Sequence, residues 1–331
     1  MAYLNLVVAA GLYPWRVAAT LTAPAAAYRA LTEDVALVDR SERGKLALAG
    51  PEAKAFLNGQ VSNDVEALGA GTGLYATFLT PKGKMLGDLR VLDLGDELWL
   101  DTERAALQAL FDLIRRGTVG WRAELHKRTV QQALLSLGGP RAGAAAGAED
   151  LGPEHASRRA TLGGAPVVLV ATDLGVDVIC EADDAVRVRA ALDVPEAPQA
   201  VAEIVRVESG RPRFGVELDG SVIPQEAGLN ERAVSFTKGC YVGQETVARL
   251  HWRGKPNRHL RGLRLSAPAA PGDVLRAGER EVGHVGSAVV SPRLGPIALA
   301  LVRREVQPGD TIAVGPARAA ATVVELPFTP R

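Results

Sequence analysis

The stretch Lys238-Gly-Cys-Tyr-Val-Gly-Gln-Glu-Thr246 is the most distinctive in the chain. Two glycines flank its cysteine, and glycine lets a backbone turn tightly or approach another group closely. Cations at Lys238 and Arg249 favour the reactive thiolate form of Cys240. A lone cysteine is also commonly a small buried side chain in a turn, and the residues alone leave both interpretations open.

The composition around this stretch is that of a globular protein. The chain has 331 residues, 47% of them hydrophobic, which suffices for two or three domains. Lys and Arg total 38 and Asp and Glu total 38, and this balance argues against general nucleic-acid binding, which needs a basic surplus. The two cysteines, Cys180 and Cys240, form neither a disulfide framework nor a metal cage, so we expect a cytoplasmic protein. Cys180 ends an alternating strand pattern and is expected to pack in a core.

The start of the chain does not predict membrane targeting. The segment 1–11 is apolar, but no basic residue precedes it, as a signal peptide requires. No apolar run reaches the ~18–20 residues of a membrane helix. We therefore expect no membrane partner.

Periodicity predicts an α+β region followed by an all-β region. A helix is expected over 101–116, capped by Asp101 and carrying one apolar stripe. Other helices are expected near 24–31, 51–57, 183–192 and 198–208, and strands near 36–39, 133–137 and 167–171. Beyond Pro256, short apolar runs and two Pro-Gly-Asp turns predict a β-barrel. The expected domains are therefore 1–256 and 257–331.

Several stretches together carry a family resemblance. Lys-Gly-Cys-Tyr-x-Gly-Gln-Glu resembles the signature of the YgfZ proteins and of their mitochondrial counterparts in iron–sulfur assembly, a branch of the glycine-cleavage T-protein family. Three further stretches resemble the N-terminal half of a T-protein: Val38-Asp-Arg-Ser-Glu-Arg-Gly-Lys-Leu, Gly50-Pro-Glu-Ala-Lys-Ala-Phe-Leu and Val61-Ser-Asn-Asp-Val. Arg206-Val-Glu-Ser-Gly-Arg-Pro resembles the segment that T-proteins use at the pterin.

The resemblance implies a fold and a function. The fold is a cloverleaf of two interleaved α+β subdomains and a C-terminal β-barrel around a central channel. The implied function is a factor that binds tetrahydrofolate, or a one-carbon derivative of it, and helps assemble or repair iron–sulfur clusters, including those of enzymes that methylthiolate tRNA. Its partners are then folate and iron–sulfur client or assembly proteins. Because a cluster usually has four cysteine ligands, Cys240 predicts a transient role and no resident metal.

Glu208 is the strongest candidate for the pterin. Val201, Ile204 and Val205 lie at helical spacing, and Glu208 extends their apolar stripe. A buried carboxylate needs donors, and a pterin edge offers two N–H groups side by side. The alternative is a structural ion pair with a nearby arginine of segment 206–213.

Further folate-binding candidates come from the motif and its surroundings. They are Lys238, Tyr241 and Gln244 of the motif, Asn63 and Asp64 of a polar turn that the resemblance places near the channel, and Arg253. Arg253 belongs to a basic stretch, 249–261, that suits the anionic tail of folate. The turn residues are equally typical of an Asx-turn. The basic stretch 249–261 is also compatible with a solvated linker, or with RNA stacking on Trp252.

Position 87 separates two functions of the superfamily. T-proteins have paired aspartates at the end of the equivalent hairpin, and one of them assists aminomethyl transfer. This chain has Gly87-Asp88, so at most one acid remains, and this argues against an aminomethyltransferase. Asp88 stays a candidate folate-binding residue. A scaffold without chemistry, in which Cys240 only shapes a turn, is the third possibility.

Overall fold

The first α/β subdomain is an antiparallel sheet with two helices packed against it. The computed structural model describes residues 25–328. The strand order is β3-β4-β5-β2-β6, with bounds Gly73–Leu79, Met85–Asp93, Glu97–Thr102, Gly44–Ala49 and Glu124–Lys127. Helices α2 (Ala53–Gln60) and α3 (Arg104–Gly117) bury their apolar sides in its core. The stripe predicted for α3 is present, with Leu107, Leu110 and Ile114 buried.

The predicted cap of that helix is wrong. Asp101 lies in β5, and its carboxylate is paired with Arg43 and Arg90, whereas the residue before α3 is Glu103. The pairing of Asp101 between neighbouring strands removes it from the helix end.

The second α/β subdomain is interleaved with the first. Its strand order is β1-β7-β10-β9-β8, with bounds Ala36–Asp39, Gln132–Gly138, Gly175–Glu181, Ala165–Ala171 and Ser157–Leu162. Strand β1 pairs with β7, almost a hundred residues later, while the chain between them forms the first sheet. The core includes buried Cys180, together with α4 (Ala142–Ala146) and α5 (Ala185–Leu192), which follows the short 3-10 helix η2 (Ala182–Asp184).

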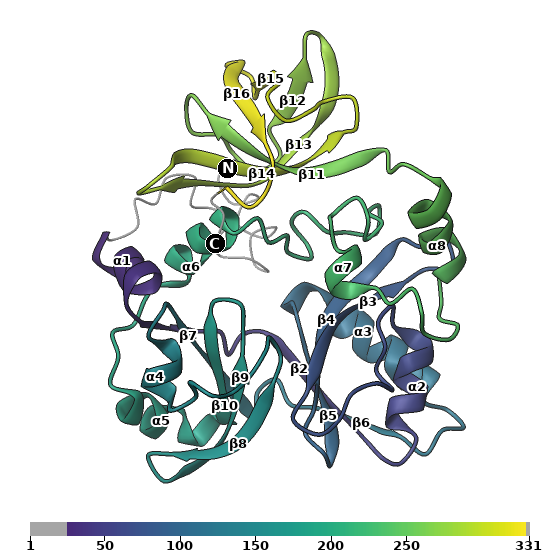
Figure 1. The fold of residues 1–331 in the computed structure, drawn as a ribbon, viewed down its shortest axis with the longest axis vertical. Helices are drawn as coiled ribbons and strands as arrows, with labels where there is room; N and C mark the ends of the chain where they lie inside the picture. The colour runs from purple at the N-terminus through teal and green to yellow at the C-terminus, as the bar shows by residue number, and fades with distance from the viewer. Residues whose placement is uncertain (1–24, 329–331) are drawn as a thin grey trace, which may run out of the picture.

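The third part is a closed barrel above the two sheets (Figure 1). The strand order around it is β11-β14-β13-β12-β15-β16, with bounds Arg258–Leu265, Gly295–Arg303, Arg280–Ser291, Val274–Ala277, Thr311–Val314 and Ala319–Val324. The three parts confirm the predicted architecture of two interleaved α+β subdomains and a C-terminal barrel.

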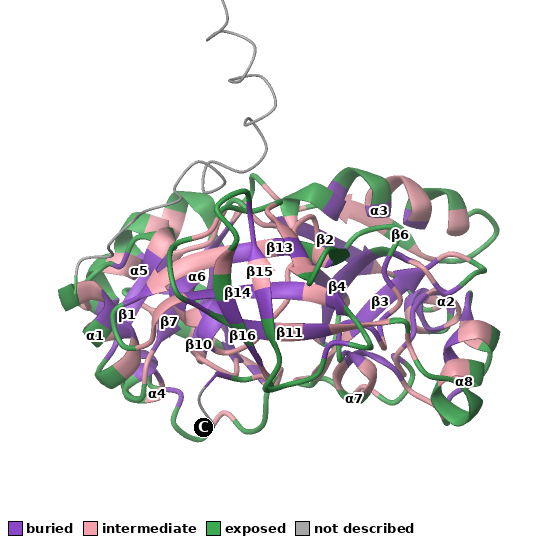
Figure 2. Cartoon of the chain, turned by 90° about the horizontal axis from the view of Figure 1, so that it is seen from above, coloured by how far each residue is buried: buried purple, intermediate pink, exposed green. Residues whose placement is uncertain are grey.

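Four helices lie between these parts or at their edges. Helices α1 (Ala25–Glu33) and α6 (Gln199–Glu208) share a core between the second sheet and the barrel. Helix α7 (Asn230–Ala233) lies beside β3, and α8 (Gln244–Arg253) lies at the outer edge of the first subdomain. Figure 2 shows the buried residues concentrated in the strands and an exposed outer surface on α8. The apolar segment 1–11 lies outside the described residues. Within residues 25–328, no helix is long and apolar enough to span a bilayer.

Candidate functional site

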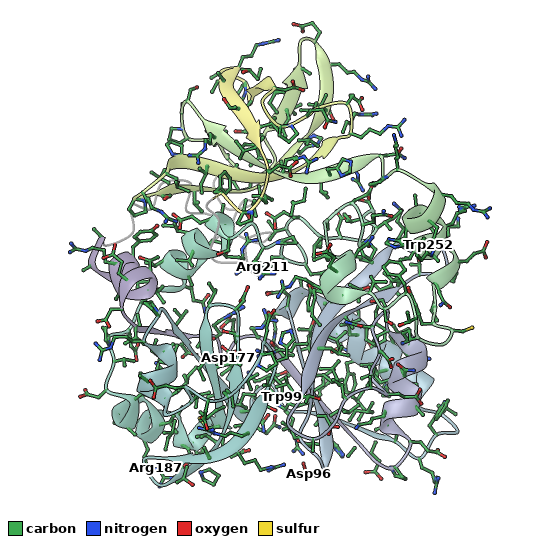
Figure 3. The ribbon with its side chains drawn as sticks, in the orientation of Figure 1. Asp96, Trp99, Asp177, Arg187, Arg211 and Trp252 are labelled. Atoms are coloured by element: carbon green, nitrogen blue, oxygen red, sulfur yellow. The ribbon has the colours of Figure 1, made fainter. Side chains whose placement is uncertain are left out.

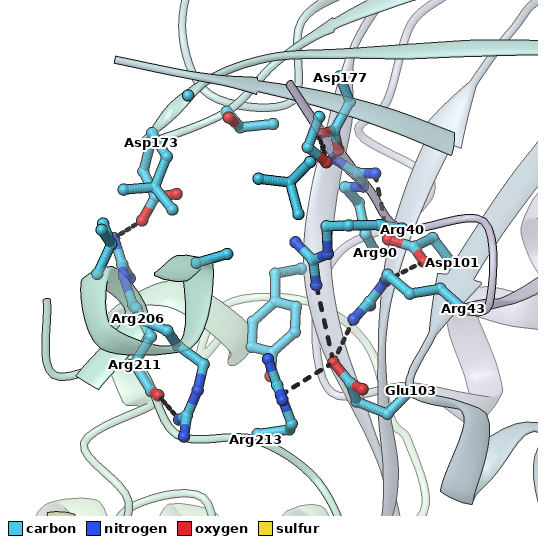
Figure 4. A pocket seen from close by; sticks show the side chains of 18 of the residues that line it. Arg40, Arg43, Arg90, Asp101, Glu103, Asp173, Asp177, Arg206, Arg211 and Arg213 are labelled. Carbon is cyan, nitrogen blue, oxygen red and sulfur yellow. Dashed lines mark hydrogen bonds and ion pairs between the residues drawn. The ribbon is translucent and has the colours of Figure 1, made fainter. Parts of the chain in front are cut away.

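A cavity of about 250 Å³ lies where the two sheets, α6 and the loop after α6 meet. Figure 4 shows it lined by a set of charged side chains. They come from β1 and the turn after it, from β4 and β5, from the β9–β10 turn, and from the segment 203–213. We call this space the central cavity.

Asp88 is the acid of β4 that faces the central cavity. It is 6% exposed, and Tyr75 donates a hydrogen bond to its Oδ2. Its Oδ1 is buried and has no hydrogen-bond partner in the part of the chain that the structure describes. Burial raises the pKa of Asp88 to about 6; the charge of Glu103 adds to this effect, while the Tyr75 hydrogen bond opposes it. Such a carboxyl group accepts or donates a proton near neutral pH.

Position 87 faces the opposite side of the same strand. A Cβ atom on Gly87 would lie 2.9 Å from the side chain of Leu110 in α3, because successive strand residues point to opposite faces of the sheet. An aspartate there would point into the core and away from the central cavity. The absence of the paired acid therefore removes nothing from the cavity, and the sequence argument against aminomethyl transfer loses its force.

Arginine–carboxylate pairs form much of the cavity wall. Arg206 lies 2.6 Å from Glu203 and 3.3 Å from Glu217, and Arg213 lies 3.0 Å from Glu203. Burial alone would raise the pKa of Glu203, but the Arg206 and Arg213 guanidiniums outweigh it and hold the pKa at about 2. This wall therefore stays charged and internally neutralised at physiological pH.

His155 carries a second buried atom without a hydrogen bond. Its Nε2 lies 3.8 Å from Glu154, but its Nδ1 makes no hydrogen bond to any described residue. Its φ of 72° is unusual for a residue other than glycine. Burial, together with Arg90 and Arg232, lowers the pKa of His155 to about 4, so the ring is neutral at pH 7. Strained conformations of this kind are enriched at ligand sites.

Among the residues predicted to bind folate, Asp88 lines the central cavity and the others do not. The carboxylate of Glu208 accepts hydrogen bonds from Tyr28 and Ser291 and forms an ion pair with Arg293 at 3.2 Å. It therefore joins α1, α6 and the barrel. Glu208 does not line the central cavity, and its arginine partner is Arg293 and not Arg206, Arg211 or Arg213. Its role at the pterin stays a prediction. Glu203, five residues earlier on α6, faces the cavity instead.

The motif residues lie outside the central cavity and attach the loop before α8 to the first subdomain. Lys238 Nζ donates to the carbonyls of Asn58, Val61 (2.9 Å) and Asn63 (2.8 Å), at and just beyond the end of α2. Burial lowers the pKa of Lys238 to about 8. Tyr241 is buried in a core, and Gln244 begins α8.

The motif glycine at position 243 is required by its surroundings. Its φ is 86°, and a Cβ there would lie 2.6 Å from the carbonyl oxygen of Thr80. The glycine therefore lets the loop before α8 pack on the β3–β4 turn. Cys240 is exposed on this loop and does not line the cavity.

The remaining candidates lie in turns or at the surface. Asn63 Nδ2 donates to the carbonyls of Tyr75 (2.9 Å) and Arg232 (3.3 Å), and the carboxylate of Asp64 accepts from the Ala67 amide. The Asp64 contact matches the turn interpretation, whereas Asn63 joins the turn to β3 and α7. Arg253 is exposed at the end of α8, beside Trp252, which is 71% exposed and lies at the edge of the molecule (Figure 3).

Most residues of the cavity wall carry no sequence signal that marks them as functional. Arg40 and Arg43 belong to a stretch used only for the resemblance, and His155 lies in a loop without any motif. Strand alternation would have placed Asp88 and Arg90 on one face. No sequence pattern indicates that this face meets α6, because the two are more than a hundred residues apart.

Comparisons with known proteins identify two family domains and several relatives. The chain matches the GCVT N-terminal domain over residues 13–238 and the glycine cleavage T-protein C-terminal barrel domain over residues 258–329. It is 30% identical to an aminomethyltransferase of Saccharopolyspora erythraea, with 95% of this chain and 92% of the relative covered. It is also 30% identical to an aminomethyltransferase of Thermotoga petrophila, with 90% and 87% covered.

The fold is similar to that of the glycine cleavage system aminomethyltransferase T from Bartonella henselae. The TM-score is 0.81 at 21% identity, covering 92% of this chain and 89% of that one. At this identity the likeness shows the fold alone. The two domain matches, which together span most of the sequence, show that this chain belongs to the glycine cleavage T-protein (GCVT) family.

Proposed function

We propose that the protein binds tetrahydrofolate in the central cavity. Proteins of the GCVT family bind tetrahydrofolate, a carrier of one-carbon units. The observation that carries the proposal is Asp88, which lines the cavity and whose buried Oδ1 has no hydrogen-bond partner within residues 25–328. Buried polar atoms normally have partners, so a ligand N–H group is the natural one. The neutral ring of His155 supplies a second contact of the same kind.

The size of the cavity suits part of a folate. Its volume of about 250 Å³ is near the lower end of small-molecule sites, ~300–1,000 Å³. It accommodates a ring system, with the rest of the ligand extending to solvent. Titration of the purified protein with tetrahydrofolate under anaerobic conditions tests this proposal. The absence of saturable binding would refute it.

We further propose that the protein belongs to the YgfZ branch and supports iron–sulfur enzymes. The support is the Lys238–Thr246 motif, which presents an exposed thiol at Cys240. Because Cys240 lies outside the central cavity, it is available to a partner protein and does not act on the bound folate directly.

Complementation separates this role from a scaffold. The gene is deleted in a host that depends on it, and tRNA methylthiolation is measured with wild-type protein, Cys240→Ser or Cys180→Ala supplied back. Loss of methylthiolation with Cys240→Ser but not with Cys180→Ala, at equal protein levels, supports the thiol role. Equal rescue by all three favours the scaffold. No defect on deletion would refute the iron–sulfur role.

Aminomethyl transfer is the second candidate function. One observation favours it: Asp88 lines the cavity, whereas position 87 points into the core, so the cavity has an acid despite Gly87. An assay with tetrahydrofolate and an aminomethylated carrier protein tests it. Turnover by the wild type that is lost in Asp88→Asn supports this function, and no turnover by the wild type rejects it.

A further inference from the structure

Arg40 differs from the other arginines of the cavity wall. It follows β1 directly, and its backbone amide is fixed to the Leu134 carbonyl at 2.9 Å. Its side chain is 32% exposed and extends into the central cavity (Figure 4). Within residues 25–328 this side chain donates no hydrogen bond, and its nearest carboxylate oxygen, on Glu103, is 4.0 Å away.

The other cavity arginines are neutralised at closer range. Each has a carboxylate oxygen within 3.1 Å, and they are Arg43, Arg90, Arg206, Arg211, Arg213 and Arg232. Glu103 forms an ion pair with Arg43 and lies 3.7 Å from Arg213. Its negative charge is therefore shared, and it neutralises Arg40 only weakly. Burial, and then the nearby charge of Arg43, lower the pKa of Arg40. A guanidinium has five N–H donors, and those of Arg40 face the cavity.

The chemistry of the surroundings selects the class of anion. A carboxylate matches the planar fork of a guanidinium with two parallel hydrogen bonds. A phosphate would bring a second negative charge close to Glu42 and Glu103, which also line the cavity. The charges of Glu103 and Arg43 act on both Arg40 and Asp88, so the cation and the acid share one space. This space suits a ligand with a polar N–H group at one end and a carboxylate group at the other.

We propose that Arg40 recognises a carboxylate group on the ligand of the central cavity. Two sources have this chemistry: the glutamate tail of a folate and a small carboxylic acid bound as a second substrate. The first source rests on the proposed folate function, and the second does not. Arg40 acts here as a binding and specificity residue. Its removal leaves no orphaned partner, because Glu103 keeps Arg43 and Arg213.

The test compares ligands with and without the carboxylate. Wild type, Arg40→Gln and Arg40→Lys are titrated anaerobically with tetrahydrofolate and with tetrahydropteroate, which lacks the glutamate, and binding of glycine is followed by NMR. Arg116→Gln, which removes an exposed charge from α3, is the matched control, and thermal melts check folding.

If the tail is recognised, Arg40→Gln weakens tetrahydrofolate binding about 10- to 100-fold and leaves tetrahydropteroate binding within about twofold. If a small acid is recognised, Arg40→Gln abolishes the glycine signal and leaves both pterins unchanged. An equal loss for both pterins, or no change with any of the three probes, overturns the proposal. If the wild type binds glycine but neither pterin, and Arg40→Gln no longer binds glycine, the folate function fails and the role of Arg40 stands.

Discussion

Replacing Asp88 by asparagine is expected to stabilise the protein at high pH. The pKa of Asp88 is raised from 3.8 to about 6, so the folded state holds its proton more tightly than the unfolded chain does. At ~1.4 kcal/mol per tenfold difference in proton affinity, ionising Asp88 in the fold costs about 3 kcal/mol at pH 8. This cost is absent below the unfolded pKa, grows as the pH rises toward the folded pKa, and is complete above it. Asparagine does not titrate, so its advantage shrinks to about 1 kcal/mol at pH 4.5.

The assay is urea unfolding of both proteins at pH 8 and pH 4.5. The difference in unfolding free energy between Asp88→Asn and wild type should be larger at pH 8 by about 2 kcal/mol. Asp101→Asn is the contrasting control, because Arg43 and Arg90 outweigh burial and hold the pKa of Asp101 below its usual value. That variant should lose stability by nearly the same amount at both pH values, because Asp101 is already ionised at pH 4.5. A gap for Asp88→Asn that is the same at both pH values would refute the electrostatic reasoning.

Three further outcomes are expected. Glu208→Ala should lower the unfolding free energy by about 1–3 kcal/mol, because buried donors lose their acceptor, while tetrahydrofolate affinity measured by titration stays as in wild type; weaker folate binding by the folded variant would restore Glu208 as a pterin residue. Gly243→Ala should lower the unfolding free energy, measured in urea, by about 1–3 kcal/mol because of the positive φ and the carbonyl oxygen beside it. Gly239→Ala, with no atom within 4 Å of the added methyl, should change it little. Equal losses of unfolding free energy would argue against this packing. In thermal melts, Cys180→Ala should lower the midpoint because Cys180 is buried, and Cys240→Ala should not, because Cys240 is exposed; a fall with Cys240→Ala would assign that thiol a packing role.

The local elements were predictable because they depend on neighbouring residues. The stripe of α3, the strand β1 and the helix α6 follow from side-chain periodicity within about ten residues. Beyond residue 256, short apolar runs separated by turn residues predicted a barrel for the same reason. The interleaving came from the family resemblance alone, since no local pattern indicates that β1 pairs with β7.

The candidate site depended on tertiary structure. Helical spacing placed Glu208 on a buried stripe, but spacing cannot specify the neighbour, and that neighbour is Tyr28 and the barrel. The motif around Cys240 was distinctive, yet in the fold it anchors Lys238 at the end of α2.

By itself, the sequence determined the α+β and barrel architecture, the balance of charge and the one distinctive thiol. Only the tertiary structure decided that this thiol and the cavity are separate, that Asp88 and not position 87 faces the central cavity, and that Arg40 reaches its nearest described carboxylate, on Glu103, only at 4.0 Å. The physical reason is that periodicity describes a residue relative to its own strand or helix. Burial, charge pairing and unsatisfied hydrogen bonds depend on segments that meet across more than a hundred residues.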